Sequence, residues 1–142
     1  SQLQSNQPVH IRNADTLKWV TQNGKSIAVL SGKVDIYLEK DQITITADTV
    51  WYYSESKIFK AAGHVKTIKI DEQNGKLVAT SQRAQYEQVK KQITLNGNVK
   101  VTRGQDELLG ETLVITMGDD GTTLEGVQVS GTLNPQSNQT TH

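Results

Sequence analysis

Apolar and polar residues alternate one by one along much of the chain. Ile43, Ile45 and Ala47 are separated by Thr44 and Thr46, and similar alternation recurs over residues 34–38, 93–95, 99–101 and 113–117. Such a pattern gives each strand one apolar and one wet face, which is typical of antiparallel sheets that cover one core. No segment has a convincing helical period. The pattern therefore predicts an all-β protein.

The alternating segments recur with a period near 30 residues. Gly32, Gly63, Gly97 and Gly126 are separated by 31, 34 and 29 residues, and similar apolar residues surround each of them. A small residue lies sixteen positions before three of these glycines, at Ala47, Ser81 and Gly110. A repeat of this length indicates one small β unit used about four times, each copy completing the core of its neighbour.

The segments between the strands carry turn signals. Asn23-Gly24, Asn74-Gly75 and Asp120-Gly121 suit the left-handed backbone of tight hairpins, and residues 54–57 and 88–91 occupy the equivalent place in repeats two and three. The repeating glycines follow an apolar strand directly, which predicts bulges or bends there. Four such units predict a flattened stack, either a jelly-roll or an open barrel, whose end strands expose unpaired backbone.

Length and composition limit the class of protein. The chain has 142 residues and no cysteine, so we expect one domain with neither disulfides nor a cysteine zinc site. Residues 1–8 and 132–142 are rich in Ser, Asn, Gln and Thr and are predicted to be flexible, which leaves a domain over 9–131. No apolar run is long enough for a membrane helix, and no signal peptide is visible, so Ser1 could begin a trimmed chain.

The zero net charge conceals an uneven distribution. Residues 57–104 carry ten basic and three acidic side chains, whereas residues 105–142 carry six acidic and no basic ones. The basic middle could attract an anionic ligand or the acidic tail of a neighbouring molecule. Alternatively, the third and fourth repeats lie side by side and neutralise each other.

Signatures of catalysis are missing. His10, His64 and His142 lie far apart without metal-ligand spacing, and Asp119-Asp120-Gly121 lacks the alternation of a calcium loop. No nucleophile–base pair or phosphate loop is present, and the balanced charge disfavours nucleic acid. A β-helix polysaccharide lyase would need clustered acids or bases in one groove. We therefore expect a protein that is not an enzyme and has no cofactor or metal.

The repeated unit carries a family resemblance. Ile93-Thr94-Leu95-Asn96-Gly97-Asn98-Val99 begins a stretch that continues to Gly104 and is followed by Leu108-Leu109-Gly110-Glu111-Thr112-Leu113. This unit resembles the OstA/LptA family of lipopolysaccharide-transport proteins, and residues 43–52 match it again with Ala47-Asp48. The similarity covers residues 8–131. It departs from the pattern at Lys33, His64 and Val127, which replace the asparagine, and at Ser81-Gln82 and Gly110-Glu111, which replace Ala-Asp.

The resemblance implies a twisted, incompletely closed antiparallel β-jelly-roll in the periplasm of a Gram-negative bacterium. Members of the family pass lipopolysaccharide from the inner towards the outer membrane and join related jelly-rolls head to tail through edge strands. A head-to-tail homo-oligomer is therefore possible. The alternative is a structural or adaptor domain of a larger outer-membrane assembly protein that binds protein rather than lipid.

An acyl chain exposes many methylene groups to water, each worth about 0.8 kcal/mol, so a carrier must offer a dry apolar groove. Mostly branched aliphatic residues on the predicted inward faces are the candidates, although they could also simply pack on one another. The candidate lipid-binding residues are Ile36, Ile45, Val50, Tyr52, Phe59, Val65, Leu77, Tyr86, Ile93, Val99, Val101, Leu113 and Ile115.

Two further groups are candidates for contacts with ligands or partners. Lipid A phosphates near the groove mouth could meet a basic set, which could equally be a solvated face. If Tyr52 faces inwards, Trp51 and Tyr53 face outwards and could contact a partner or pack beneath a loop. The basic set consists of Lys66, Lys69, Lys100 and Arg103, with Lys90 and Lys91 beside them.

Overall fold

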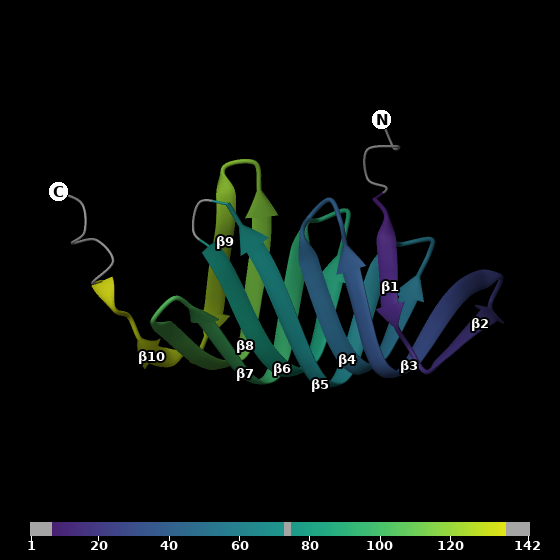
Figure 1. Cartoon of the computed structure of the whole chain (residues 1–142), viewed down its shortest axis with the longest axis horizontal. Coiled ribbons are helices and arrows are strands. Elements are labelled where there is room, and N and C mark those ends of the chain that lie inside the picture. The colour runs from purple at the N-terminus through teal and green to yellow at the C-terminus, as the bar shows by residue number, and fades with distance from the viewer. Residues whose placement is uncertain (1–6, 73–74, 136–142) are drawn as a thin grey trace.

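A computed structural model describes residues 7–72 and 75–135. Apart from a 3₁₀ position at Pro135, the elements in this part of the chain are β-strands (Figure 1). The ten strands are β1 (Val9–Asn13), β2 (Thr16–Gln22), β3 (Lys25–Leu38), β4 (Ile43–Tyr53), β5 (Ile58–Asp71), β6 (Gly75–Glu87), β7 (Gln92–Arg103), β8 (Asp106–Gly118), β9 (Gly121–Val127) and β10 (Ser130–Thr132).

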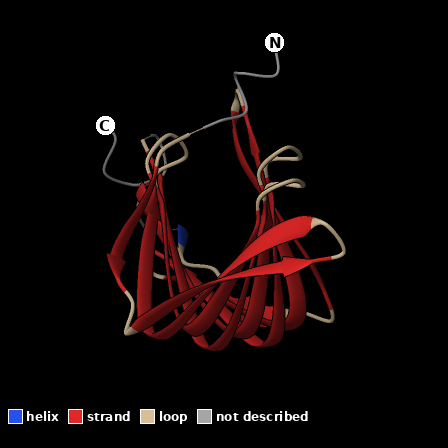
Figure 2. Ribbon diagram, turned by 90° about the vertical axis from the view of Figure 1, so that its right-hand side faces the viewer, coloured by secondary structure: helices blue, strands red, loops and turns tan. Residues whose placement is uncertain are grey.

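The ten strands form one antiparallel sheet that is bent into two walls. Strands β3 to β8 pair in sequence order, and each of their pairings shifts register near its middle. Figure 2, a view along the long axis, shows the strands rising on two sides of a curved floor. The "β2 wall" contains β2, residues 25–31, 49–53, 58–62, 83–87, 92–96 and 112–118, and β9; the "β1 wall" contains β1, residues 34–38, 43–47, 65–71, 75–81, 99–103 and 106–110, and β10.

Three of the four repeating glycines form the predicted bends. Gly32, Gly63 and Gly97 have φ values of +84°, +86° and +89°, and the residue after each is also left-handed. At Gly63, a Cβ atom would collide with the carboxylate group of Asp48. The repeated small-acid motif therefore has a structural reason, because its second residue packs against the glycine of the next bend.

The fourth glycine has a different role. Gly126 pairs with Leu113 inside β9 and does not have a left-handed backbone. A Cβ atom there would collide with the side chains of Leu113 and Val129. The prediction of a bend at Gly126 is therefore wrong, and this glycine is needed for close packing.

The turns lie along the open margins of the two walls. Asn23 and Gly24 form the predicted tight turn, with φ values of +55° and +75°. The segments 54–57 and 88–91 are turns as predicted, and 39–42 is a third of the same length. The tight hairpin predicted at Asp120-Gly121 is present, but it is shifted by one residue, because Gly121 pairs with Gly118 and the two turn residues are Asp119 and Asp120. Asn74 lies outside the described residues.

The side chains of the two walls meet in one core. Ile36, Ile45 and Ile93 are at most 1% exposed, and they belong to a single cluster with residues from both walls. The buried side chains of the two walls thus pack against one another. The expectation of an open apolar groove along the middle is not met in this structure.

The two ends of the sheet are edges. Strands β1 and β2 lie at one end, and β9 and β10 lie at the other (Figure 1). Large apolar side chains are exposed at the first end, where Ile11 is 50%, Leu17 52% and Trp19 63% accessible. The apolar inner faces of the two walls are therefore exposed to solvent at the end of the molecule formed by β1 and β2.

Candidate functional site: an apolar slot between two walls

Apolar rows cross the whole sheet on its inner face. The register places Trp19 opposite Ala28 at one end and Leu124 opposite Ile115 at the other. With about 4.8 Å between neighbouring strands, this row is about 34 Å long. Its members, in spatial order, are Trp19, Ala28, Tyr52, Phe59, Tyr86, Ile93, Ile115 and Leu124.

The structure places all thirteen candidate lipid-binding residues inside the slot. Twelve of them are buried, and the thirteenth, Tyr52, is partly buried against the same cluster. Sequence alternation therefore predicted the inward orientation correctly. Their contact with lipid remains a prediction.

Aromatic rings form the centre of the long row. The rings of Tyr52 and Phe59 stack with centroids 4.4 Å apart, and those of Phe59 and Tyr86 with centroids 6.2 Å apart. Burial raises the pKa of the Tyr52 hydroxyl group. Three adjacent rings thus make a flat apolar surface on the β2 wall.

Thr67 is a polar exception in the slot. It lies between Ile45 and Ala79 in an inner row of the β1 wall. The residue is 0% exposed, and its hydroxyl oxygen has no hydrogen-bond partner among the described residues. A buried hydroxyl group of this kind opposes folding.

Replacing Thr67 by Val is expected to stabilise the protein by about 1–2 kcal/mol, because it removes an unsatisfied polar group at nearly constant volume. Urea unfolding monitored by circular dichroism measures the change. Thr80→Val is the matched control, because Thr80 is exposed in the neighbouring strand β6 and should change stability by less than about 0.5 kcal/mol. Equal effects of the two substitutions would contradict the assignment.

The predicted basic set divides between two faces. Lys69 and Arg103 each pair with the buried Leu77 on the inner face, close to the open margin of the β1 wall. Lys66 and Lys100 alternate with buried residues and point outwards, and Lys100 forms an ion pair with Glu107 at 3.0 Å. Their predicted place near the groove mouth is therefore wrong, because they have the opposite strand phase from the lining.

A polar cluster that the sequence did not predict joins the walls at their open margin. Asp41, in the turn after β3, accepts hydrogen bonds from Tyr86 and from Lys91, and the Lys91 Nζ–Asp41 Oδ1 distance is 3.0 Å. Burial alone would raise the pKa of Asp41, but the hydrogen bonds from Tyr86, Lys91 and Gln7 and the charge of Lys91 lower it overall. Burial and the Asp41 carboxylate raise the pKa of Tyr86, which keeps its hydroxyl group protonated as a donor.

Beside this cluster, the margin has a polar opening. A hollow of about 260 Å³ lies between residues 69–72 of the β1 wall and residues 117–122 of the β2 wall. Burial lowers the pKa of Lys69 at its rim, although nearby carboxylates partly oppose this effect. At the open margin, which forms the mouth of the slot, the Asp41 cluster thus connects the two walls, and a hollow lies beside this cluster.

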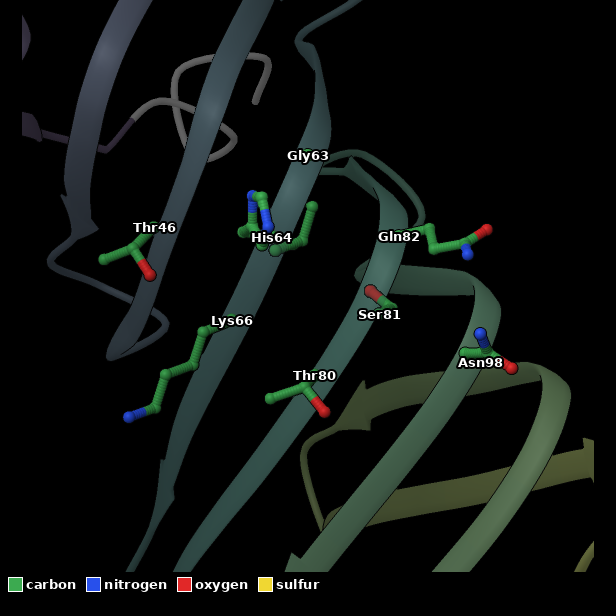
Figure 3. Close-up of a pocket in the computed structure, with 9 residues that line it drawn as sticks. Thr46, Gly63, His64, Lys66, Thr80, Ser81, Gln82 and Asn98 are labelled. Atoms are coloured by element: carbon green, nitrogen blue, oxygen red, sulfur yellow. The ribbon is translucent and has the colours of Figure 1, made fainter.

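The outer face has several hollows. Figure 3 shows one of about 720 Å³ at the bends, with Lys66 and Asn98 on its rim. Another, of about 430 Å³, is lined by Trp51 and Tyr53, and the Lys60 ammonium group lies 5.2 Å from the centre of the Tyr53 ring. Trp51 and Tyr53 therefore face outwards as predicted; their contact with a partner remains a prediction.

Comparison with known proteins decides the family. Residues 13–132 match the family model described as LptA/(LptD N-terminal domain) LPS transport protein. The chain belongs to this family. The OstA/LptA resemblance seen in the repeated unit is thereby confirmed.

The crystal structure of LptH, described as the LptA homologous periplasmic component of the lipopolysaccharide transport device from Pseudomonas aeruginosa, has a similar fold. The TM-score is 0.72 at 16% identity, and the match covers 91% of this chain and 96% of LptH. No curated protein matches the sequence. The predicted open LptA-like jelly-roll is confirmed, and no helix within residues 7–72 and 75–135 is long and apolar enough to cross a membrane.

Proposed function

We propose that this LptA-like chain is a periplasmic, non-catalytic component of lipopolysaccharide transport that holds lipid A acyl chains between its two walls. The uninterrupted apolar row from Trp19 to Leu124 is the observation that carries this proposal. Each methylene group removed from water contributes about 0.8 kcal/mol, so a row of this length can shelter a complete acyl chain. Hydrolysis of ATP elsewhere would supply the energy for movement along the row.

The proposal requires the walls to separate. Their aliphatic side chains pack on one another, so an acyl chain must replace contacts between walls with contacts to itself. Such an exchange of one apolar contact for another changes the buried area little. The exposed Trp19 and Leu17 provide an apolar entrance at one end, where the inner face is uncovered.

We further infer that copies of this chain, or related jelly-rolls, join end to end and make the rows continuous. Strands β1 and β2 at one end and β9 and β10 at the other are the edges to which another sheet can add. Lys18 of β2 places a basic side chain at the first end and Glu125 of β9 places an acidic one at the second, whereas Arg12, Lys25 and Glu107 already form ion pairs within the chain. Complementary charge favours a head-to-tail order.

Photo-crosslinking in isolated cell envelopes tests the lipid part of the proposal. A photoreactive phenylalanine at Tyr52, inside the slot, is expected to form adducts with lipopolysaccharide. The same group at Trp51, which faces outwards from the adjacent position of β4, is the matched control. Adducts are detected by immunoblotting with an antibody against lipopolysaccharide. Equal labelling at both sites, or adducts with proteins alone, would contradict the proposal and favour an adaptor role.

A further inference from the structure

A polar cluster around Asp41 connects the two walls next to the aromatic rings of the slot. Asp41 belongs to the β1 wall, and both of its carboxylate oxygens bond to residues of the β2 wall. One oxygen accepts from Tyr86, the last ring of the stack, and the other from Lys91. The carboxylate group of Asp41 thus connects a turn at the open margin to Tyr86 in the lining of the slot.

Two more residues complete the cluster. The Gln7 side-chain amide donates to Asp41 at 3.0 Å and to Tyr86 at 3.3 Å, and its oxygen accepts the backbone N–H of Asp41 at 3.1 Å. The Lys69 ammonium group donates to the backbone oxygen of Asp41 at 2.7 Å. Asp41 is therefore held on every side, and two lysine side chains converge on it.

The burial of the Asp41 carboxylate distinguishes this ion pair from the surface ones, although the Lys91 side chain is 42% exposed. The Asp41 side chain is only 10% exposed, whereas the carboxylate partners of His10 and Lys25 are 56% and 64% exposed. Removing one partner of a buried pair leaves a charge that is hard to accommodate, whereas exposed pairs contribute little. The Asp41 carboxylate therefore depends on its partners, and any group that competes for the lysines would weaken the connection between the walls.

We propose that Asp41 is a latch that occupies the place of a lipid phosphate group, and that the phosphate of lipid A opens the slot by taking Lys91 and Lys69 from it. This proposal rests on the proposed function. A phosphate ester carries about −1.5 to −2 charges and three strong acceptor oxygens at neutral pH, so it satisfies two ammonium groups better than one carboxylate does. Release of Asp41 also frees Tyr86, and the walls above the ring stack can then separate.

Matched variants test the latch through the rate of lipid uptake. Asp41→Asn is expected to speed the uptake of fluorescent lipid A roughly tenfold, because it weakens a hydrogen bond that involves charged groups. Tyr86→Phe should act in the same direction with the packed ring retained, and thermal melts confirm folding. Glu39→Gln is the control, because this carboxylate lies in the same turn but pairs with His10 at the surface. Equal rates for Asp41→Asn and Glu39→Gln would overturn the latch.

The role of the phosphate group has its own test. Wild-type protein should take up phosphorylated lipid A faster than dephosphorylated lipid A, and Lys91→Gln should abolish this difference. Inorganic phosphate at the same concentration should not speed the uptake of dephosphorylated lipid A. Acceleration by inorganic phosphate would overturn the assignment to the lipid, as would discrimination that persists in Lys91→Gln.

A covalent lock completes the experiment. The chain has no cysteine, so Asp41→Cys with Lys91→Cys can be joined specifically across the mouth by a short bismaleimide. The joined protein should lose uptake, whereas Lys57→Cys with Val89→Cys, linked within turns of the β2 wall, should retain it. A chain that binds no lipid A in any form contradicts the proposed function itself. A chain that binds lipid A equally well when locked contradicts only the latch.

Discussion

Replacing Ile93 by Asp is expected to unfold the protein at neutral pH. Ile93 is 0% exposed and lies in the middle of the long inner row. Loss of a buried aliphatic side chain of this size costs about 2–5 kcal/mol, and a buried unpaired carboxylate adds several kcal/mol more. Together these terms amount to about 5–10 kcal/mol, which is comparable with the stability of a typical domain, about 5–15 kcal/mol. Far-UV circular dichroism and thermal unfolding provide the measurement.

Thr94→Asp is the matched control for this substitution. Thr94 is the next residue of β7, and its partly exposed side chain points to the outer face between Gln85 and Val114. A carboxylate there remains hydrated, so the expected change is below about 1 kcal/mol. A folded Ile93→Asp protein with near-wild-type stability would show that water reaches the slot and that the core is not continuous between the walls.

The period-two pattern explains why so much of the lining could be predicted. An apolar strand residue between two polar neighbours points to the buried face of the sheet while its neighbours point to the solvent. The residues paired with it on adjacent strands point to the same face. Ile45, Ile93 and Ile115 were therefore placed correctly from sequence. The bends at Gly32, Gly63 and Gly97 could also be predicted from local sequence, because a left-handed backbone favours glycine.

The latch depends on contacts that no local pattern encodes. Asp41 lies 45 residues from Tyr86 and 50 residues from Lys91, and Asp41 and Lys91 both lie in turns. Charged turn residues are ordinarily solvated, so their sequence gives no sign of burial. Only the bend of the sheet, which brings the two margins together, places them in contact.

Whether the walls touch was also beyond the reach of the sequence. Alternation predicts which side chains face inwards, but the angle between two walls follows from bends, side-chain volumes and the twist of the sheet. The structure shows walls in contact, joined by Asp41 and continuous with exposed apolar residues at the β2 end. The proposed transport therefore requires two separate events, which can be tested independently. The walls must separate at the Asp41 cluster, and neighbouring molecules must associate through the ends of their sheets.

The end of the sheet at β2 supplies the second large effect. Replacing both Leu17 and Trp19 by Ser is expected to weaken association between copies of the chain at least tenfold. Trp19 is 63% and Leu17 52% exposed, and both continue inner rows to the edge, where a second sheet would cover them. A buried interface Trp commonly contributes 2 kcal/mol or more, and each 1.4 kcal/mol corresponds to a factor of ten in affinity.

Sedimentation velocity over a range of protein concentrations measures this association, and urea unfolding checks that the monomer is unchanged. Val89→Ser is the control, because Val89 is 68% exposed in a turn away from both sheet ends. High salt should also weaken the wild-type association, since Lys18 of the β2 end would meet Glu125 of the partner's β9 end. If the double variant and Val89→Ser associate equally, the apolar β2 end is not the joint between copies. The inner row from Trp19 to Leu124 would then not be extended by a second copy at the β2 end.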